Sequence, residues 1–281
     1  MQLFTRFTNL LLNDVTFLLD ESISKLGEIH EKQLQMDDTA AWQARPTPER
    51  REVENGLRTL ERQCESYIQL ASATLDMLEY LTTEITEPFL RPELLDRLAA
   101  MLSLNVIQMV GPKCSNLRVR QPEKYHWRPR EVLSMLVGII LNLSRREPFL
   151  RAMARDQRSF SEPVFTKTAT TLRRHSIRPP SDIDRLERVI RRVVELAGQE
   201  AAAEEALGEV PEEFLDPLMF TIMEDPVLLE TSRQIVDKAT IVAHLLNDPT
   251  DPFNRMPLSM DQVKEVPDLK ERIHKFLARQ Q

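Results

Sequence analysis

Apolar side chains recur at three- and four-residue intervals along most of this chain, and that spacing limits its fold more than any other feature. Residues spaced in this way lie on one face of an α-helix. The pattern begins at once and predicts a helix to about residue 36, with an apolar face formed by Phe4, Phe7, Leu10, Leu11, Val15, Leu18 and Leu19. Only six of the 281 residues are glycine, a composition that favours helix over a β-sandwich or barrel. We therefore expect a mainly α-helical protein.

Prolines and glycines indicate where these helices begin and end. Residues 37–48 are predicted to be a linker because Pro46 and Pro48 interrupt the helical spacing. Thr47 is expected to cap the next long helix, with Pro48 at its first position, and this helix is predicted to end near Pro88. Further helices are predicted from residue 92 to the Gly111-Pro112 pair and over residues 129–143, 162–175 and 181–207, the last capped by Ser181, with a polar loop at 113–128.

A five-residue sequence occurs twice in this helical part. Glu87-Pro88-Phe89-Leu90-Arg91 returns as Glu147-Pro148-Phe149-Leu150-Arg151. Either the copies mark equivalent corners of two stacked helical units, as in armadillo-like solenoids, or the match is a coincidence, since its spacing exceeds the usual repeat.

An alanine- and glutamate-rich stretch at residues 199–209 is interpreted either as the fraying end of a helix or as a semi-rigid linker. Both interpretations predict a domain boundary. We therefore divide the chain into a helical scaffold at residues 1–198, a linker at 199–209 and a small domain at 210–281.

Charge and hydropathy argue against two classes of function. The net charge is −7, and residues 209–281 contribute −6 of it, with 14 acidic and 8 basic side chains. Because nucleic-acid binding needs an excess of basic residues, we expect no nucleic-acid partner. No apolar run reaches the roughly 18 residues of a membrane span, so no membrane partner is expected. Two cysteines, Cys64 and Cys114, are too few for a disulfide framework and indicate an intracellular protein.

The residue pattern changes at residue 210, where short motifs rich in aspartate and proline replace the helical spacing of apolar residues. In chain order they are Phe214-Leu215-Asp216-Pro217, Met223-Glu224-Asp225-Pro226-Val227, Val236-Asp237, His244-Leu245 and Asp251-Pro252-Phe253-Asn254-Arg255-Met256-Pro257-Leu258. This succession resembles the U-box family and departs from its pattern only in two turns, at residues 230–233 and 265–268. The resemblance implies a small α+β domain with a RING-like fold. A short strand at 235–237 and helices at 238–246 and 268–279 are expected.

The helical part resembles a known family as well. Residues 13–21, 88–94 and 111–117 are similar to the core of the ubiquitin conjugation factors that elongate ubiquitin chains. The similarity extends over nearly the whole chain, but members of that family are far longer. We therefore expect this chain to be the C-terminal part of such a factor.

The residues of the small domain argue against zinc. It has no cysteine and only two histidines, His244 and His274, whereas a RING domain needs about eight ligands for two ions. We expect its loops to be held instead by hydrogen bonds and ion pairs within a polar network of Asp225, Asp237, His244, Asp251 and Asn254. Neither a metal nor a cofactor is expected.

The resemblance to U-boxes also implies a site. Leu218 and Phe220 on a first loop and Pro257 on a second correspond to the apolar patch that docks a ubiquitin-conjugating enzyme; ordinary packing under the loop is the alternative. Arg255 stands where such ligases carry a cation that reaches both ubiquitin and the conjugating enzyme; an ion pair with Asp251 is the alternative. Three neighbouring apolar residues are expected in the core: Met219, Ile222 and Met223.

The implied function is that of a ubiquitin ligase, a transferase that builds polyubiquitin chains for proteasomal degradation. It would hold thioester-linked ubiquitin in a reactive pose and supply no nucleophile of its own. The implied partners are a conjugating enzyme, ubiquitin and ubiquitinated substrates, and a hexameric AAA ATPase segregase, in the cytoplasm and nucleus. The competing hypothesis is a non-enzymatic adaptor that keeps the U-box only as an interaction module.

Two features of the helical part leave alternatives open. Cys64 lies on the apolar face of a long helix, so we expect a buried core thiol rather than a transthiolating one, and Cys114 is expected to be structural. The Tyr125-His126-Trp127 cluster either packs its loop against the helices or forms a peptide-binding corner.

Overall fold

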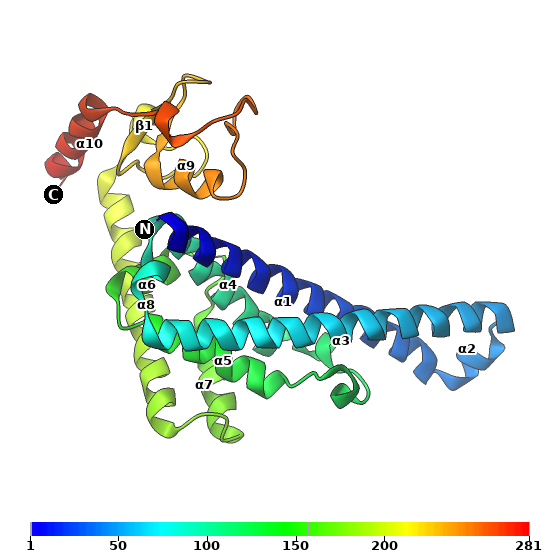
Figure 1. The fold of residues 1–281 in the computed structure, drawn as a ribbon. Coiled ribbons are helices and arrows are strands. Elements are labelled where there is room, and N and C mark those ends of the chain that lie inside the picture. The colour runs from blue at the N-terminus through cyan, green and yellow to red at the C-terminus, as the bar shows by residue number, and fades with distance from the viewer. Residues whose placement is uncertain (1, 157, 281) are drawn as a thin grey trace. The chain divides into compact units, whose positions relative to one another are not determined.

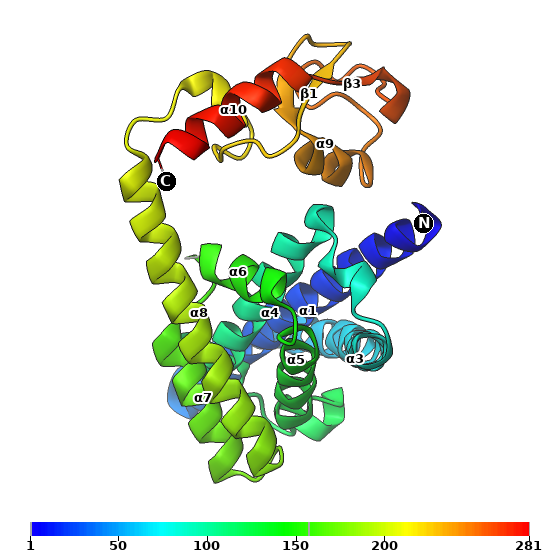
Figure 2. The same ribbon diagram turned by 90° about the vertical axis from the view of Figure 1, so that its left-hand side faces the viewer.

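The protein consists of two compact units (Figures 1 and 2), described by a computed structural model for residues 2–156 and 158–280. The first unit reaches to Glu195 without the segment Arg91–Leu95, which groups with the second unit from Leu196 onward. The first unit is helical, and the second contains a small three-stranded sheet. The predicted fold class, mainly α with a small α+β domain, is confirmed.

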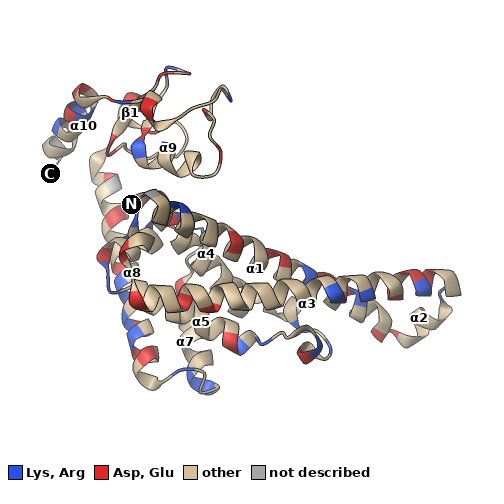
Figure 3. Cartoon of the chain, viewed as in Figure 1, with Lys and Arg blue, Asp and Glu red and all other residues tan. Residues whose placement is uncertain are grey.

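Eight helices account for most of the described chain up to residue 207. They are α1 (Gln2–Asp37), α2 (Thr39–Ala44), α3 (Thr47–Glu84), α4 (Pro92–Val110), α5 (Pro129–Leu143), α6 (Glu147–Arg155), α7 (Glu162–Arg174) and α8 (Pro180–Leu207). The long helices α1 and α3 run side by side in opposite directions, and α5 packs against α3 (Figure 1). Basic and acidic residues are interspersed along them (Figure 3). No helix of the described residues is long and apolar enough to cross a membrane.

Several helix boundaries differ from the predicted ones, including the end of α3, which lies at Glu84 and not near Pro88. The predicted linker contains the short helix α2, because the Asp38 carboxylate caps it by accepting a hydrogen bond from the Ala41 amide at 3.1 Å. Thr47 lies inside α3 rather than at its cap, and no side chain caps that helix. Helix α8 begins at Pro180, a residue suited to the first helical turn, so Ser181 also lies inside its helix.

The repeated five-residue sequence adopts two conformations. The first copy forms a 3-10 turn, Glu87–Leu90, and the second begins helix α6. This helix has nine residues, too few for the apolar spacing to predict it. The central phenylalanine is buried in both copies, with 2% of Phe89 and none of Phe149 exposed. The copies therefore share a packing role but not a secondary structure.

The loop between α4 and α5 packs against the helices. Tyr125 and Trp127 are buried, and the Tyr125 hydroxyl donates to the Glu61 carboxylate on α3 at 2.8 Å. His126 remains exposed and lies 3.5 Å from the Glu65 carboxylate. Of the two interpretations of this aromatic cluster, packing holds for its tyrosine and tryptophan.

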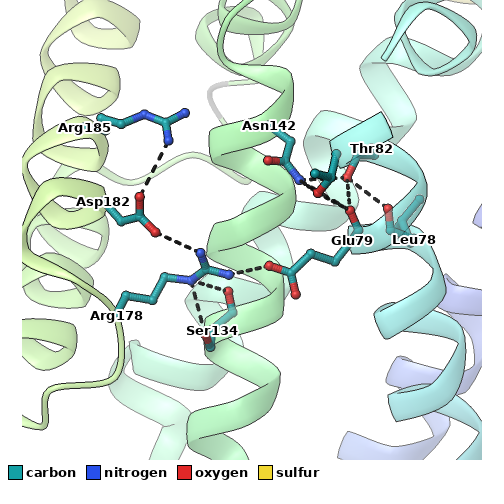
Figure 4. Close-up of polar contacts among 9 residues, drawn as sticks. Leu78, Glu79, Thr82, Ser134, Asn142, Arg178, Asp182 and Arg185 are labelled. Atoms are coloured by element: carbon teal, nitrogen blue, oxygen red, sulfur yellow. Dashed lines mark hydrogen bonds and ion pairs between the residues drawn. The ribbon is translucent and has the colours of Figure 1, made fainter. Parts of the chain in front are cut away.

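A polar cluster joins α3, α5 and the start of α8 inside the first unit (Figure 4). The Arg178 guanidinium pairs with the Glu79 carboxylate on α3 and, at 3.1 Å, with Asp182 on α8. Its Nε also donates to the Ser134 carbonyl on α5 at 2.9 Å. Burial raises the pKa of Glu79, and the charge and hydrogen bond of Arg178 oppose that rise. The ion pair crosses α5 beside Gly138, where a side chain would collide with it.

The second unit is built on a small antiparallel sheet. Strands β1 (Pro226–Leu229), β2 (Ile235–Asp237) and β3 (Val263–Glu265) pair in the order β2-β1-β3, and Val227 faces Val236 on one side and Glu265 on the other. Only β2 is predicted from the sequence. Helices α9 (Lys238–Leu245) and α10 (Pro267–Gln280) complete the unit, each within two residues of its predicted bounds.

Two apolar clusters form the core of this unit. Residues of the sheet, of α9 and of the following loop make up the first: Val227, Leu229, Val236, Ile241 and Leu258. The second joins α10 to the segment before the sheet through Phe214, Met223, Leu269 and Ile273. Each of the two loops that carry the candidate site residues adjoins one of these clusters.

Candidate functional site

Loop 1, defined as residues 216–221, is a tight turn closed at both ends by backbone hydrogen bonds. The Asp216 amide donates to the Thr221 carbonyl, and the Phe220 amide donates to the Asp216 carbonyl, each at 2.8 Å. Phe220 closes the turn in the left-handed region with φ of 58°. Side chains other than glycine enter this region only at a steric cost, so the turn holds Phe220 in a conformation that it would not adopt alone.

Loop 2, defined as residues 251–256, repeats this backbone design. The Asp251 amide donates to the Met256 carbonyl and the Arg255 amide to the Asp251 carbonyl, again at 2.8 Å each. Arg255 takes the left-handed position, with φ of 61°. Both loops open with Asp-Pro and reach the left-handed residue at the fifth position, so Phe220 and Arg255 are structural equivalents.

The Asp216 carboxylate holds loop 1 from inside and is fully buried. One oxygen accepts from the amides of Leu218 at 2.7 Å and Met219 at 3.1 Å, and the other accepts from the amide of Asp237 at 2.8 Å. Burying a polar group is costly unless such hydrogen bonds replace those that it made with water. Asp216 therefore fixes the inside of the turn and ties it to the start of α9.

The Asp251 carboxylate, also fully buried, performs the same task in loop 2. One oxygen accepts from the Phe253 amide at 2.8 Å and the other from the Thr231 hydroxyl at 2.5 Å. Burial would raise the pKa of this carboxyl, but the donors around it, among them the Thr231 hydroxyl and the Phe253 amide, outweigh that effect, so the pKa lies below its usual range.

The remaining members of the predicted polar network join the loops to the fold. Asp237 caps α9 by accepting from the Ala239 amide at 2.8 Å, and it also accepts from the amides of Glu224 at 2.6 Å and Asp225 at 3.0 Å. The Asp225 carboxylate pairs with Lys270 on α10. These bonds connect the segment after loop 1 to α9 and α10.

His244 and Asn254 brace loop 2. The His244 Nε2, near the end of α9, lies 2.8 Å from the Thr250 carbonyl, and the Asn254 amide group donates to the Thr231 carbonyl at 3.0 Å. The N-cap of α9 thus contacts loop 1, and the last turn of α9 contacts Thr250, the residue before loop 2. Asp216 and Thr231 are the network members that sequence reasoning missed; the shared Asp-Pro spacing of the two loops is the signal for Asp216.

Three apolar side chains of loop 1 face solvent. Phe220 is 77% exposed, Leu218 37% and Met219 57%. Packing under the loop, the alternative for the first two, is therefore not seen. The expectation that Met219 lies in the core is wrong, because the Asp216 carboxylate fills the inside of the turn and directs the side chains outward. Met223, with 2% exposed, is in the core as predicted.

Loop 2 presents a mixed surface. Pro257 is exposed, and its backbone forms a bridge with Thr250 that matches the bridge between Leu215 and Ile222 around loop 1. Apolar side chains flank the cation: Phe253 and Met256 are exposed, and sequence reasoning missed both.

Arg255 is exposed, and its guanidinium forms no ion pair with any residue that the structure describes. The alternative, a pair with Asp251, is not seen because that carboxylate is occupied by amides and a hydroxyl. The cation is left available to another molecule.

Metal-binding side chains and thiols are the groups to check for further chemistry within residues 2–156 and 158–280. No cluster of three or more histidine, cysteine or acidic side chains suited to a metal ion occurs in these ranges. Cys64 is fully buried, and burial raises the pKa of its thiol to about 12, which keeps it protonated and unreactive. Its expected role as a core thiol fits this environment, and Cys114 is half-buried.

Comparison with known proteins places both parts of the chain. The sequence profile described as "Ubiquitin elongating factor core" matches residues 1–194, and that described as "U-box domain" matches residues 210–281. Similar proteins include "Ubiquitin conjugation factor E4" of Schizosaccharomyces pombe, 43% identical over 274 residues, and "E4 ubiquitin-protein ligase UFD2" of Saccharomyces cerevisiae, 40% identical over 273 residues.

These alignments cover 98% and 96% of this chain but only 27% and 28% of the two yeast proteins. "Probable ubiquitin conjugation factor E4" of Arabidopsis thaliana is 39% identical over 98% of this chain and 27% of its own length. The chain thus spans little more than a quarter of the length of these relatives. The resemblance inferred from the motifs is confirmed, and the chain belongs to the ubiquitin elongating factor core family and carries a U-box domain.

Proposed function

We propose that this chain is a ubiquitin ligase that binds a ubiquitin-conjugating enzyme and promotes transfer of ubiquitin from its thioester to lysines, so that polyubiquitin chains grow. The observation that carries the proposal is the exposure of Phe220, at 77%, in a strained turn that a buried carboxylate holds in place. A large aromatic ring kept in solvent at a conformational cost is typical of a binding anchor. Leu218 and Pro257 extend the apolar surface.

The proposed mechanism is positional. Docking would restrict the orientation of the thioester-linked ubiquitin, which raises the rate of attack by lysine without any nucleophile from this chain. Arg255 would donate hydrogen bonds from its planar guanidinium to ubiquitin and to the conjugating enzyme. The buried, protonated Cys64 supports this assignment, because it is unsuited to carry ubiquitin itself.

Family resemblance alone supports a wider context. We propose that the chain acts on substrates already ubiquitinated and destined for the proteasome, in the cytoplasm and nucleus, together with a hexameric AAA ATPase segregase. Copurification of the ATPase with tagged chain from cell extract tests this partner. Its absence from the purified fraction, with ubiquitinated proteins present, would retire the partner and leave the ligase proposal standing.

The decisive experiment is a discharge assay, in which a conjugating enzyme loaded with ubiquitin is mixed with free lysine, with and without the chain. We expect Phe220→Ala to lower the acceleration about thirtyfold, the effect of losing roughly 2 kcal/mol at a binding anchor. Leu218→Ala and Arg255→Ala are expected to lower it as well. Each variant should keep the helicity of the wild-type chain.

Matched controls separate the site from general surface effects. Leu34→Ala removes a side chain on α1 that is 54% exposed, and Arg233→Ala removes an exposed arginine that is also left-handed, with φ of 59°. Both should leave the rate unchanged. A wild-type chain that binds conjugating enzymes yet accelerates none of them would favour the adaptor hypothesis, and equal losses in controls and site variants would show that the site is misplaced.

A further inference from the structure

The two loops share one backbone conformation but carry chemically different side chains at the equivalent position. The fifth residue is the aromatic Phe220 in loop 1 and the cationic Arg255 in loop 2, and the two φ angles differ by only a few degrees. Glycine, the residue best suited to this conformation, stands at neither position. The side chain at the fifth position is therefore the feature that each turn presents.

Each presented side chain depends on the buried aspartate that opens its loop. The backbone carbonyl of Asp216 accepts from the Phe220 amide, while its carboxylate accepts from the two amides between them. Asp251 accepts from the Arg255 amide in the same way, and its carboxylate accepts from the Phe253 amide. One aspartate thus fixes both the closure and the interior of each turn.

We propose that Asp216 and Asp251 are positioning residues with separate tasks in the proposed ligase function, on which this inference rests. Asp216 sets the affinity for the loaded conjugating enzyme, because it holds the apolar anchor Phe220. Asp251 sets the rate within the complex, because it holds Arg255, the cation that meets the thioester-linked ubiquitin. Neither carboxylate touches the reacting atoms, since both are fully buried.

The bonding of the two carboxylates differs in a way that predicts different tolerance of asparagine. All three partners of Asp216 are backbone amides, which can only donate hydrogen bonds. In an asparagine variant the side-chain NH₂, which also donates, would lie against one of these N–H groups, and no hydrogen bond could form there. One oxygen of Asp251 instead faces the Thr231 hydroxyl, which can turn and accept. Asparagine should therefore preserve the turn geometry when it replaces Asp251 but not when it replaces Asp216.

Steady-state discharge kinetics of the full chain test the division of tasks, with the loaded conjugating enzyme as the varied substrate. We expect Asp216→Ala to raise KM by about tenfold and leave kcat nearly unchanged, and Asp251→Ala to lower kcat by about tenfold and leave KM nearly unchanged. Asp251→Asn should recover most of the lost kcat, whereas Asp216→Asn should remain close to its alanine variant. All rates are taken at a temperature where circular dichroism shows a folded chain.

Val227→Ala is the stability control, because it removes apolar contacts of β1, with 1% of Val227 exposed, and leaves the hydrogen bonds of both loops in place. Changes of kcat and KM in the aspartate variants that match those of this control would overturn the inference. So would a shift of the same parameter by both alanine variants, or equal tolerance of asparagine at the two positions. If an alanine variant does not fold, the split is measured on the side chains that the aspartates hold: Phe220→Ala should raise KM and Arg255→Ala should lower kcat, and a shift of the same parameter by both would overturn the inference.

Failure of the proposed function looks different. A wild-type chain that neither binds a conjugating enzyme nor speeds discharge would remove the ligase assignment, and the division of tasks with it. A wild-type chain that is active and sensitive to Phe220→Ala, but whose aspartate variants show no split between KM and kcat, would remove only the inference.

Discussion

Asp216 and Asp251 are carboxylates without solvent contact, and each is stabilised by hydrogen bonds rather than by a cation. Removing an ionised carboxylate from water is costly unless several donors replace the lost hydration. Both residues lie at loop starts where successive backbone amides point inward, so the turn itself supplies those donors. For Asp251, whose pKa lies below its usual range, the arrangement makes loop geometry and ionisation depend on each other.

That dependence predicts how acid affects the U-box. The pKa of Asp251 is lower in the folded state than the usual value of about 3.9, so its contribution to stability is complete above that pH and is lost as pH falls through the folded pKa. We expect Asp251→Asn to reduce the free energy of unfolding by roughly 1–2 kcal/mol at pH 7. Urea denaturation should show this difference shrinking below about pH 4.

Glu230→Gln serves as the control, because the Glu230 carboxylate is exposed and 3.9 Å from Lys264. Its effect at pH 7 should stay within about 0.5 kcal/mol, as is usual for surface pairs. A deficit of Asp251→Asn that stays constant down to acid pH would contradict the assignment of an ionised, hydrogen-bonded carboxylate.

The two cysteines differ in expected reactivity. Because burial raises the pKa of Cys64 to about 12, almost no thiolate is present near neutral pH. Iodoacetamide at pH 8 should modify Cys114 in the folded chain and reach Cys64 only in denaturant, as followed by mass spectrometry. In a Cys114→Ser chain, rapid labelling without denaturant would show that Cys64 is accessible.

At the scale of elements, Gly138 lets α3, α5 and α8 share one ion pair. A Cβ placed on Gly138 would overlap Glu79 Oε1 and Arg178 Nη2, so any side chain there must displace the pair (Figure 4 shows these partners). Since the pair is largely buried, its partners lose hydrogen bonds when they separate. The glycine thus serves the contact between helices.

We expect Gly138→Ala to lower the free energy of unfolding by roughly 1–2 kcal/mol, even though alanine is the better helix former. Gly27→Ala on α1 is the matched control, because no atom lies within 4 Å of the added Cβ. That variant should gain up to about 1 kcal/mol. Thermal unfolding of both variants measures the contrast; a gain at both positions would mean that the ion pair moves aside without cost.

Long elements are predictable from their own apolar spacing, whereas short ones are predicted only where a family motif marks them, as for β2 and α9. Helix α5 is predicted over the residues that it occupies, because its apolar face repeats through four turns and Pro129 fixes its start. Helix α6 and strands β1 and β3 have nine, four and three residues, too few for a period to appear. Their order comes from partners distant in sequence, such as the pairing of Val227 with Val236 and Glu265.

The candidate site divides in the same way. Exposed Leu218, Phe220 and Pro257 were identified by resemblance to U-boxes, and the polar network by its residue types. Asp216 can be found only by comparing the two loops, because its one signal is the Asp-Pro spacing that it shares with Asp251. The same turn reverses the expectation for Met219, since a position beside core residues is directed outward when the loop interior is already filled.

At the scale of the whole molecule, the U-box is held by bonds that the chain itself supplies. We expect a chelator such as EDTA to leave its circular dichroism and thermal midpoint unchanged, because the residues described by the structure include no cluster suited to a metal ion. A zinc-dependent RING domain treated in parallel should lose its structure. A large loss of helicity in this chain would contradict the hydrogen-bonded account of its loops.

The left-handed conformation of Phe220 and Arg255 affects what selection for thermal stability would do to this protein. Each carries strain of about 1–2 kcal/mol that glycine would relieve, against an entropic cost of about 0.5–1 kcal/mol. Selection of heat-resistant variants will therefore favour glycine at the two positions where the proposed function needs a side chain. In this domain a higher melting temperature would identify variants that fold well but lack the side chains of the proposed site. Resistance to heat is therefore a poor criterion for choosing active chains.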